Sequence, residues 1–93
     1  MKYGLIGEKL SHSFSKEIHE SLADYTYDLC EIAIDDLANF LAKRDFCAVN
    51  VTIPYKKEVI PFLDFVSDVA YELQAVNVIV NKDGKLYGYN TDY

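Results

Sequence analysis

The chain has 93 residues, 51% of them hydrophobic, and a formal net charge of −6. This length and composition predict a single domain with a modest core rather than a disordered segment. Lys and Arg are scattered, which argues against a nucleic-acid binder, and no segment approaches the roughly 20 apolar residues of a membrane span. The charged pair Glu8–Lys9 stands where a signal peptide would continue its apolar run, so we expect a cytoplasmic protein.

The first half of the chain alternates strand-like and helix-like segments. A short strand is predicted over 2–6, followed by a loop and a helix that Ser15 caps. Alternating side chains predict a second strand over 25–34, and Asp35 is the expected N-cap of the next helix. This order of elements favours strands joined by helical crossovers.

The most informative stretch is NVTIPYK, 50–56, because it places polar groups where a buried strand should be apolar. Asn50 and Thr52 are two apart, so on a strand they share one face. Pro54 closes the strand, and Lys56 follows almost at once. The sequence therefore predicts an ammonium group and two hydrogen-bonding side chains at the carboxyl end of a strand, where ligands bind in open α/β sheets.

The second half of the chain predicts two helices and then a hairpin. The helices cover 57–63 and 67–73, the second capped by its first residue, a serine. Strands over 75–80 and 85–90 flank the segment 81–84, whose Asp-Gly pair signals a hairpin turn. We therefore predict an α/β fold of three layers, α/β/α, with a mostly parallel sheet and a C-terminal antiparallel hairpin.

The cysteines and histidines do not favour a metal site, and a disulfide or a catalytic thiol is the alternative interpretation of the two cysteines. Cys30 and Cys47 lie in apolar, strand-like runs and are predicted to be buried, reduced thiols. His12 and His19 have no Cys or His nearby at ligand spacing. We expect no bound metal.

Polar side chains follow several predicted strands or begin predicted helices. They form four groups: Ser13 with Ser15; Asn50, Thr52 and Lys56; Asn77; and Asn90, Thr91 and Asp92. If the middle of the sheet is parallel, several of these strand ends share one edge, where hydroxyl and amide groups bind polyhydroxylated small molecules well. The two serines at a helix N-terminus suit a carboxylate. Lys56 and Asp92 suit proton transfer as a coupled dyad.

Each group also has a purely structural alternative. The serines and Asp92 are preferred helix-capping residues. Asn50 and Thr52 could bond to neighbouring loops. A lysine at a helix start is usually solvated, and Asn77 could serve a turn or a strand edge. Only their joint placement at one edge favours a ligand site.

Three segments of the chain resemble shikimate dehydrogenases. These segments are GLIGEKLSHSFSKEIH, NVTIPYK and AVNVIV…GYNTDY, which occur in the family's order and span nearly the whole chain. The resemblance implies that residues 1–93 are the substrate-binding domain and that the activity is the NADP-dependent reduction of 3-dehydroshikimate to shikimate, a step of aromatic amino-acid biosynthesis. It also implies a second, Rossmann-type domain that binds NADP.

We expect that second domain to lie outside this chain. The four glycines, at positions 4, 7, 84 and 88, form no G-x-G-x-x-G turn between a strand and a helix. Hydride transfer requires a nicotinamide held against the substrate. We therefore expect the chain to be a fragment that does not turn over alone.

The resemblance implies roles for individual residues. Lys56 and Asp92 match the catalytic pair. The residues matched to substrate binding are Ser13 and Ser15 for the carboxylate, and Asn50, Thr52, Asn77 and Asp92 within the motifs that hold the substrate hydroxyls. Asp68 matches an acidic position near the cofactor. The partners implied are small molecules only, with neither nucleic acid nor membrane.

Departures from the family pattern leave alternatives open. Gln74 stands where Gly is common, and Val78 stands where Thr is common, which removes a hydroxyl next to Asn77. Quinate is therefore an alternative substrate. A non-catalytic binding module that kept the pocket is an alternative to the enzyme, and so is a structural α/β domain whose polar strand ends only cap loops.

Overall fold

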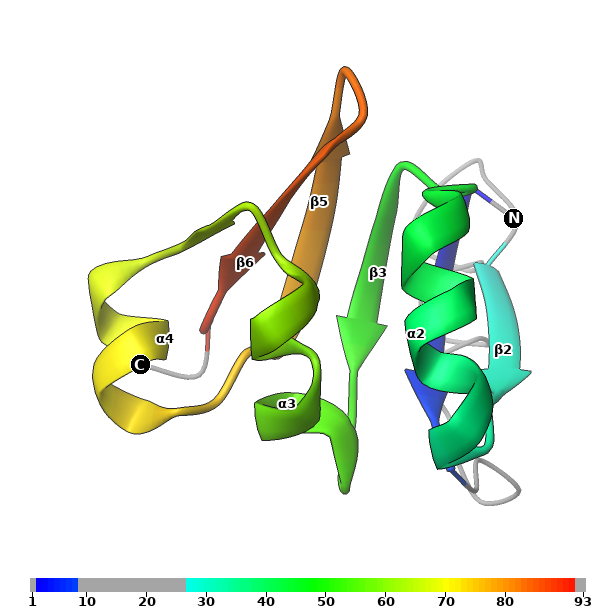
Figure 1. Ribbon diagram of the computed structural model, residues 1–93, viewed down its shortest axis with the longest axis horizontal. Coiled ribbons are helices and arrows are strands. Elements are labelled where there is room, and N and C mark those ends of the chain that lie inside the picture. The colour runs from blue at the N-terminus through cyan, green and yellow to red at the C-terminus, as the bar shows by residue number, and fades with distance from the viewer. Residues whose placement is uncertain (1, 9–26, 92–93) are drawn as a thin grey trace.

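The computed structural model describes residues 2–8 and 27–91, and the helix expected after Ser15 lies outside them. Figure 1 shows the elements as a sheet with helices packed against it. In chain order they are β1 (Tyr3–Gly7), β2 (Tyr27–Glu31), α2 (Ile34–Lys43), β3 (Ala48–Val51), α3 (Tyr55–Glu58), the 3₁₀ helix η1 (Ile60–Phe62), β4 (Phe65–Val66), α4 (Asp68–Leu73), β5 (Val78–Lys82) and β6 (Lys85–Tyr89).

The strands form one sheet in the order β2-β1-β3-β5-β6-β4. Strand β1 pairs in parallel with β2 and with β3, and β4 pairs in parallel with β6. Strand β5 is antiparallel to both of its neighbours, β3 and β6. The predicted α/β class, with a mostly parallel sheet and a C-terminal hairpin, is confirmed. Among the described strands only β5 is reversed, so it begins at the edge where the others end.

One face of the sheet carries the core. The register places Ile6 beside Val51 and Val49 beside Ile79, so these side chains share a face. Helices α2 and α3 pack on that side (Figure 1). The helical residues that contribute buried side chains to this core are Leu37, Leu41, Tyr55 and Ala70. Burial of this apolar face is the main favourable term that holds the helices on the sheet.

The predicted hairpin forms with a two-residue turn. Asp83 and Gly84 both have positive φ, 53° and 84°, as a tight turn between right-twisted strands requires. Strand β5 therefore continues through Asn81 and Lys82, which we had expected in the turn. The Asp-Gly pair correctly predicts the reversal, although β5 begins three residues and ends two residues later than expected.

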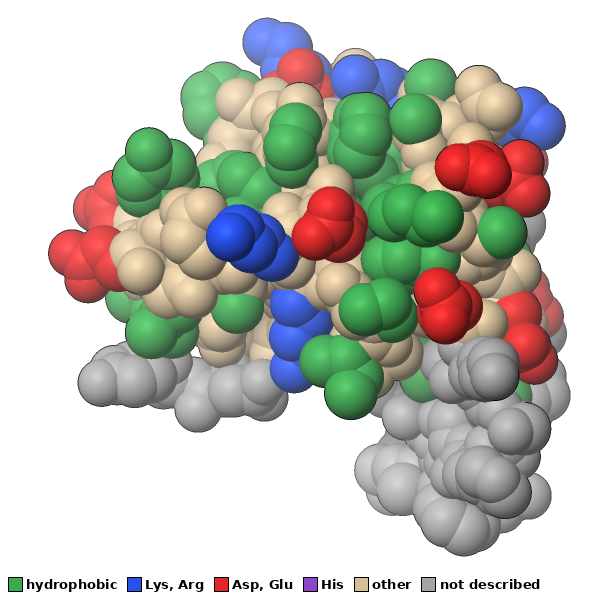
Figure 2. Space-filling model, turned by 60° about the horizontal axis from the view of Figure 1, so that its bottom comes forward, with side chains coloured by type: hydrophobic (Ala, Val, Ile, Leu, Met, Phe, Trp, Pro, Cys, Tyr) green, Lys and Arg blue, Asp and Glu red, His purple; other side chains and the backbone are tan. Residues whose placement is uncertain are grey.

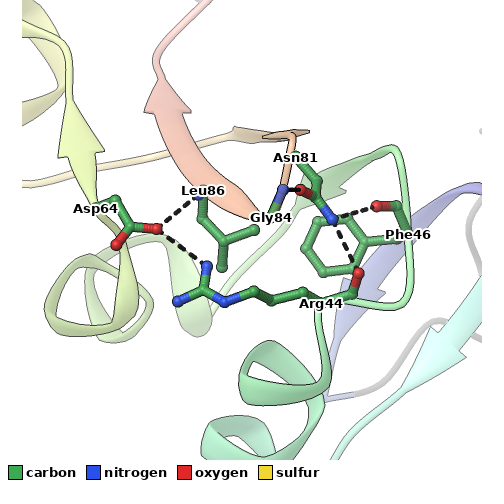
Figure 3. Close-up of polar contacts among 6 residues, drawn as sticks. All are labelled: Arg44, Phe46, Asp64, Asn81, Gly84 and Leu86. Atoms are coloured by element: carbon green, nitrogen blue, oxygen red, sulfur yellow. Dashed lines mark hydrogen bonds and ion pairs between the residues drawn. The ribbon is translucent and has the colours of Figure 1, made fainter.

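A polar network fixes this hairpin against the end of α2 (Figure 3). The side-chain amide of Asn81 donates to the carbonyls of Arg44 (2.8 Å) and Phe46 (3.0 Å) and accepts a backbone N–H from the turn. The Arg44 guanidinium contacts Asp64 at 3.0 Å, and Asp64 accepts the backbone N–H of Leu86 at 2.8 Å. These bonds lie at the end of the sheet opposite to the carboxyl ends of the parallel strands.

Three local predictions were wrong or incomplete. Helix α2 begins at Ile34 with Ala33 as its N-cap, and Asp35 lies in the first turn, where a carboxylate favours the helix dipole without capping. The helix expected over 57–63 is divided into α3 and η1, because Pro61 has no N–H to continue an α-helix. The two-residue strand β4 was not predicted, since so short a segment shows no alternation.

Other local predictions concern Ser67 and the cysteines. Ser67 is confirmed as the N-cap of α4, because its hydroxyl accepts the N–H of Ala70 at 3.2 Å. Both cysteines are free, but Cys47 is exposed and Cys30 only half-buried, so the prediction of buried thiols was wrong. Cys47 precedes β3 and points its side chain outward while its backbone pairs on both sides.

Within the described ranges no helix is both long and apolar enough to cross a membrane.

Candidate functional site

Polar groups meet where β3 and β6 end and β5 begins. Asn50 is the second-last residue of β3, Thr52 directly follows the strand, and Lys56 is the second residue of α3. Asn77 directly precedes β5, and Thr91 comes two residues after β6. Figure 2 turns this edge toward the viewer and shows basic side chains near the middle of the face. Since β3, β5 and β6 are neighbours, the groups occupy about 10 Å of one sheet edge.

The turn after β3 is held by bonds to the ends of two other strands. The Thr52 N–H donates to a carbonyl near the end of β1 at 3.0 Å, and the Tyr55 N–H donates to the Thr52 carbonyl at 3.0 Å across a cis Ile53–Pro54 bond. Tyr55 is 0% exposed, and its hydroxyl donates to the carbonyl of Ile32 just after β2. Tyr55 therefore anchors the first turn of α3 and places Lys56, half-buried, at the edge.

The segment 75–77 links this turn to the end of β6. The N–H of Val76 donates to the carbonyl of Lys56 at 2.8 Å, and the carbonyl of Asn77 accepts the N–H of the last β3 residue at 2.8 Å. On the other side, the N–H of Asn77 donates to the carbonyl of the last β6 residue at 3.0 Å. The Asn90 side chain donates into the same segment at 3.0 Å. The polar groups are thus fixed relative to one another by backbone bonds.

The side chain of Asn77 is the buried polar residue of the described part, at 7% exposure. Its Nδ2 donates to Thr91 Oγ1 at 3.1 Å, and its Oδ1 accepts the Thr91 N–H at 2.9 Å. Throughout the described ranges each buried side-chain nitrogen or oxygen has a hydrogen-bond partner. Two reciprocal bonds to one residue therefore account for the burial of this amide.

The electrostatics of the edge keep the anchoring hydroxyl protonated. Burial, and after it the carboxylates of Glu8, Asp35 and Asp36, raise the pKa of Tyr55 above its ordinary value near 10. At neutral pH the phenol is therefore a permanent donor to its carbonyl partner.

An open groove elsewhere is a poor alternative site. It lies between β2 and the second half of α2, lined by Asp28, Leu29, Cys30, Phe40, Lys43 and Asp45. Its position beside the C-terminal half of α2 is away from the edge where the parallel strands end. Two acidic side chains and one lysine in it offer no set of groups aimed at one ligand.

The structure brings together four of the predicted site residues: Asn50, Thr52, Lys56 and Asn77. Ser13, Ser15 and Asp92 lie outside the described residues. Asp68 begins α4, which follows the edge strand β4. Strands β5 and β6 lie between β4 and β3, so β4 is about 14 Å from β3 across the sheet. Asp68 is exposed and is not part of the group at the end of β3. The functional roles of all these residues remain predictions.

Two residues that contact the predicted set had been given no role. Tyr55 stands within NVTIPYK without an individual role, and Thr91 was grouped with Asn90 and Asp92 without a function. The only sequence signals were their positions directly before Lys56 and Asp92.

The described residues fit neither a metal nor a dinucleotide. No group of three or more His, Cys, Asp or Glu side chains in the described ranges is placed to hold a metal ion. The described turns from strand to helix, after β2, β3 and β4, contain no glycine. A dinucleotide pyrophosphate needs glycines there, because the backbone must approach it closely.

Comparisons with known proteins identify the family of this chain. A family model described as the shikimate dehydrogenase substrate binding domain matches residues 5–79. The NADP(+) shikimate dehydrogenase of Clostridium beijerinckii is 48% identical over 98% of this chain and 37% of its own length.

Solved structures give the same result. Shikimate dehydrogenase 1 from Peptoclostridium difficile has a TM-score of 0.88 and 41% identity, covering 100% of this chain and 38% of its own. The Thermus thermophilus shikimate 5-dehydrogenase, solved with NADP(H) and shikimate, has a TM-score of 0.90 and 32% identity, covering 99% of this chain and 38% of its own. The chain thus spans little more than a third of each relative. Because the family model matches most of its length, the chain belongs to the family of shikimate dehydrogenase substrate-binding domains.

Proposed function

We propose that this chain is the substrate-binding part of an NADP-dependent shikimate dehydrogenase, which interconverts 3-dehydroshikimate and shikimate. The observation that carries the proposal is the convergence of Asn50, Thr52, Lys56 and Asn77 on one edge of the sheet. In open α/β sheets ligands bind outside the carboxyl ends of the strands. The names of the relatives supply the substrate and the cofactor.

The groups at this edge suit a small molecule with several hydroxyls. The amides of Asn50 and Asn77 and the hydroxyl of Thr52 each donate and accept, as hydrogen bonding to an alcohol requires. The substrate carboxylate is assigned to Ser13 and Ser15. These proposed binding groups are neutral, and Lys56 is the cation among the proposed site residues.

The proposed chemistry needs one proton and one hydride to move. In the oxidation of shikimate, the proton of the reacting hydroxyl passes to the dyad of Lys56 and Asp92, while the hydride leaves the same carbon. NADP, when bound, would supply the acceptor for that hydride and, as NADPH, the hydride donor for the reverse reaction. In that direction the dyad gives its proton to the carbonyl oxygen. The two groups are proposed to share one proton as a coupled pair.

Cofactor binding is assigned mainly to residues outside this chain. The described strand-to-helix turns lack the glycines that a dinucleotide requires, so residues 1–93 are proposed as the substrate domain and the nucleotide domain as a separate unit. Asp68 is the residue of this chain proposed to lie toward the cofactor. The 93 residues alone are expected to be inactive. A cytoplasmic location belongs to the same proposal, and the two free cysteines support a reducing compartment.

The test is the oxidation of shikimate with NADP⁺ by the protein encoded by the complete reading frame. Lys56→Ala should lower kcat by about 10²–10⁴-fold, because proton transfer is lost. Lys57→Ala, at the adjacent exposed position of the same helix, is the matched control and should leave kcat unchanged. A Lys56→Ala variant with near-normal kcat contradicts the mechanism.

The same assay separates the alternatives. Faster oxidation of quinate than of shikimate identifies a quinate dehydrogenase. A protein that binds shikimate but oxidises neither compound is a binding module, and one that binds neither is a structural domain.

A further inference from the structure

We propose that Thr91 is a positioning residue that locks the Asn77 carboxamide in the orientation needed to bind a substrate hydroxyl. The inference rests on the proposed function, because it concerns how the same site recognises an alcohol. It starts from the two reciprocal bonds between these residues, Nδ2 to Oγ1 at 3.1 Å and backbone N–H to Oδ1 at 2.9 Å.

The backbone N–H of Thr91 decides which way the carboxamide points. An N–H only donates, so the atom facing it must be the amide oxygen. A flip of the Asn77 side chain would turn its NH₂ group toward that N–H and bring two donors together. The Thr91 hydroxyl, which can accept, then receives the amide hydrogen on the other side. The pair therefore excludes the flipped carboxamide.

The backbone of Asn77 is fixed independently of its side chain. Its carbonyl accepts the N–H of Val51 at 2.8 Å, and its N–H donates to the carbonyl of Tyr89 at 3.0 Å. A side chain whose backbone and amide are both hydrogen-bonded retains one geometry. An amide without these bonds would have to be ordered when the substrate binds, and the entropy lost in that ordering lowers affinity.

The hydrogen-bonding capacity of the Asn77 carboxamide shows which of its groups remain for a ligand. A carboxamide has two N–H donors and two acceptor positions, and Thr91 uses one of each. Among the described residues the second N–H and the second lone pair of Asn77 have no partner. One donor beside one acceptor is complementary to an alcohol, whereas a carboxylate could use only the donor.

The experiment compares two substitutions in the full 93-residue chain by shikimate titration. Thr91→Val keeps the shape and the backbone N–H but removes the hydroxyl, and it should weaken shikimate binding by about 3- to 10-fold. Thr91→Ser restores the hydroxyl and should bind within about twofold of the wild type. A Thr91→Val variant with wild-type affinity overturns the proposal.

A second arm shows whether Thr91 acts through Asn77. In an Asn77→Ala background Thr91→Val should have no further effect on binding. An equal loss in both backgrounds means that Thr91 acts independently and overturns the proposal.

A third measurement does not depend on the ligand. Solvent exchange of the Asn77 side-chain amide protons, followed by NMR, should be slow in the wild type and in Thr91→Ser and faster in Thr91→Val. Equal exchange in the three proteins overturns the proposal. If the exchange pattern holds but the wild type does not bind shikimate, the proposed function fails while the positioning role of Thr91 stands.

Discussion

Removing the hydroxyl of Tyr55 tests how the turn that carries Lys56 is anchored. Tyr55→Phe deletes one oxygen atom and leaves the ring in place in the core. The lost bond runs to the Ile32 carbonyl, which the structure gives no other partner within the described residues. Because Tyr55 is 0% exposed, water does not readily replace the hydroxyl. The variant therefore leaves a buried acceptor unpaired.

The expected loss follows from that unpaired carbonyl. A buried polar group left without its partner costs about 1–3 kcal/mol of unfolding free energy. For a 93-residue chain the unfolding entropy is about 0.2 kcal/mol/K, so the melting temperature should fall by about 5–15 °C. Tyr71→Phe is the matched control, because Tyr71 is 63% exposed, and it should change stability by no more than about 0.5 kcal/mol.

The pH dependence gives a second check on the same residue. The pKa of Tyr55 is raised in the folded chain, so its contribution to stability is present below pH about 10 and is lost as the pH rises toward the folded value. Thermal melts of wild type and Tyr55→Phe should therefore converge above pH about 10. An unchanged melting temperature at neutral pH, or a gap that does not narrow at alkaline pH, refutes this account of the anchor.

Three further substitutions test the backbone and the hairpin. Gln74 has left-handed backbone angles (φ 51°, ψ 42°), so Gln74→Gly should raise the unfolding free energy by about 1 kcal/mol in urea titrations, whereas Gln74→Ala should not. A Cβ at Gly88 would lie 2.5 Å from Leu63 Cδ1, so Gly88→Ala should cost about 1–3 kcal/mol, and much less in a Leu63→Ala background. A backbone N–H from the hairpin and the Arg44 guanidinium lower the pKa of Asp64 in the folded chain. The ionised Asp64 therefore stabilises the fold above pH about 4, and this contribution is lost as the pH falls. Asp64→Asn should accordingly reduce the fall in melting temperature at acid pH. A lower unfolding free energy in Gln74→Gly would contradict the backbone argument, and an unchanged one in Gly88→Ala would contradict the packing argument. An unchanged fall of melting temperature at acid pH in Asp64→Asn would contradict the electrostatic one.

Features of the fold with local chemistry were predictable from the sequence. The Asp83-Gly84 pair marked the hairpin because only residues that tolerate positive φ make that turn. Ser67 marked the start of α4 because a serine hydroxyl is a strong N-cap. The wrong cap at Asp35 shows the limit of this approach, since tertiary packing begins α2 at Ile34 without any side-chain cap.

The site was predictable only in part, because its contacts join residues far apart in the chain. The spacing of Asn50 and Thr52 and their position before Lys56 indicated a ligand-facing strand end. The antiparallel pairing of β3 with β5 places Asn77 at the same edge. The bonds between Asn77 and Thr91 join residues that are 14 positions apart, which no periodicity reveals. The departure at Gln74 from the usual glycine acquired a meaning only when its left-handed backbone was seen.

The most direct test of the central claim is a titration of the 93-residue chain with shikimate, followed by backbone amide NMR shifts. Our account predicts saturable shifts at millimolar shikimate that concentrate on Asn50, Thr52, Lys56, Asn77 and Thr91. The groove between β2 and α2 should remain unaffected. Absence of shifts at the end of β3, or shifts centred on that groove, would contradict the assignment of a shikimate site to this edge of the sheet.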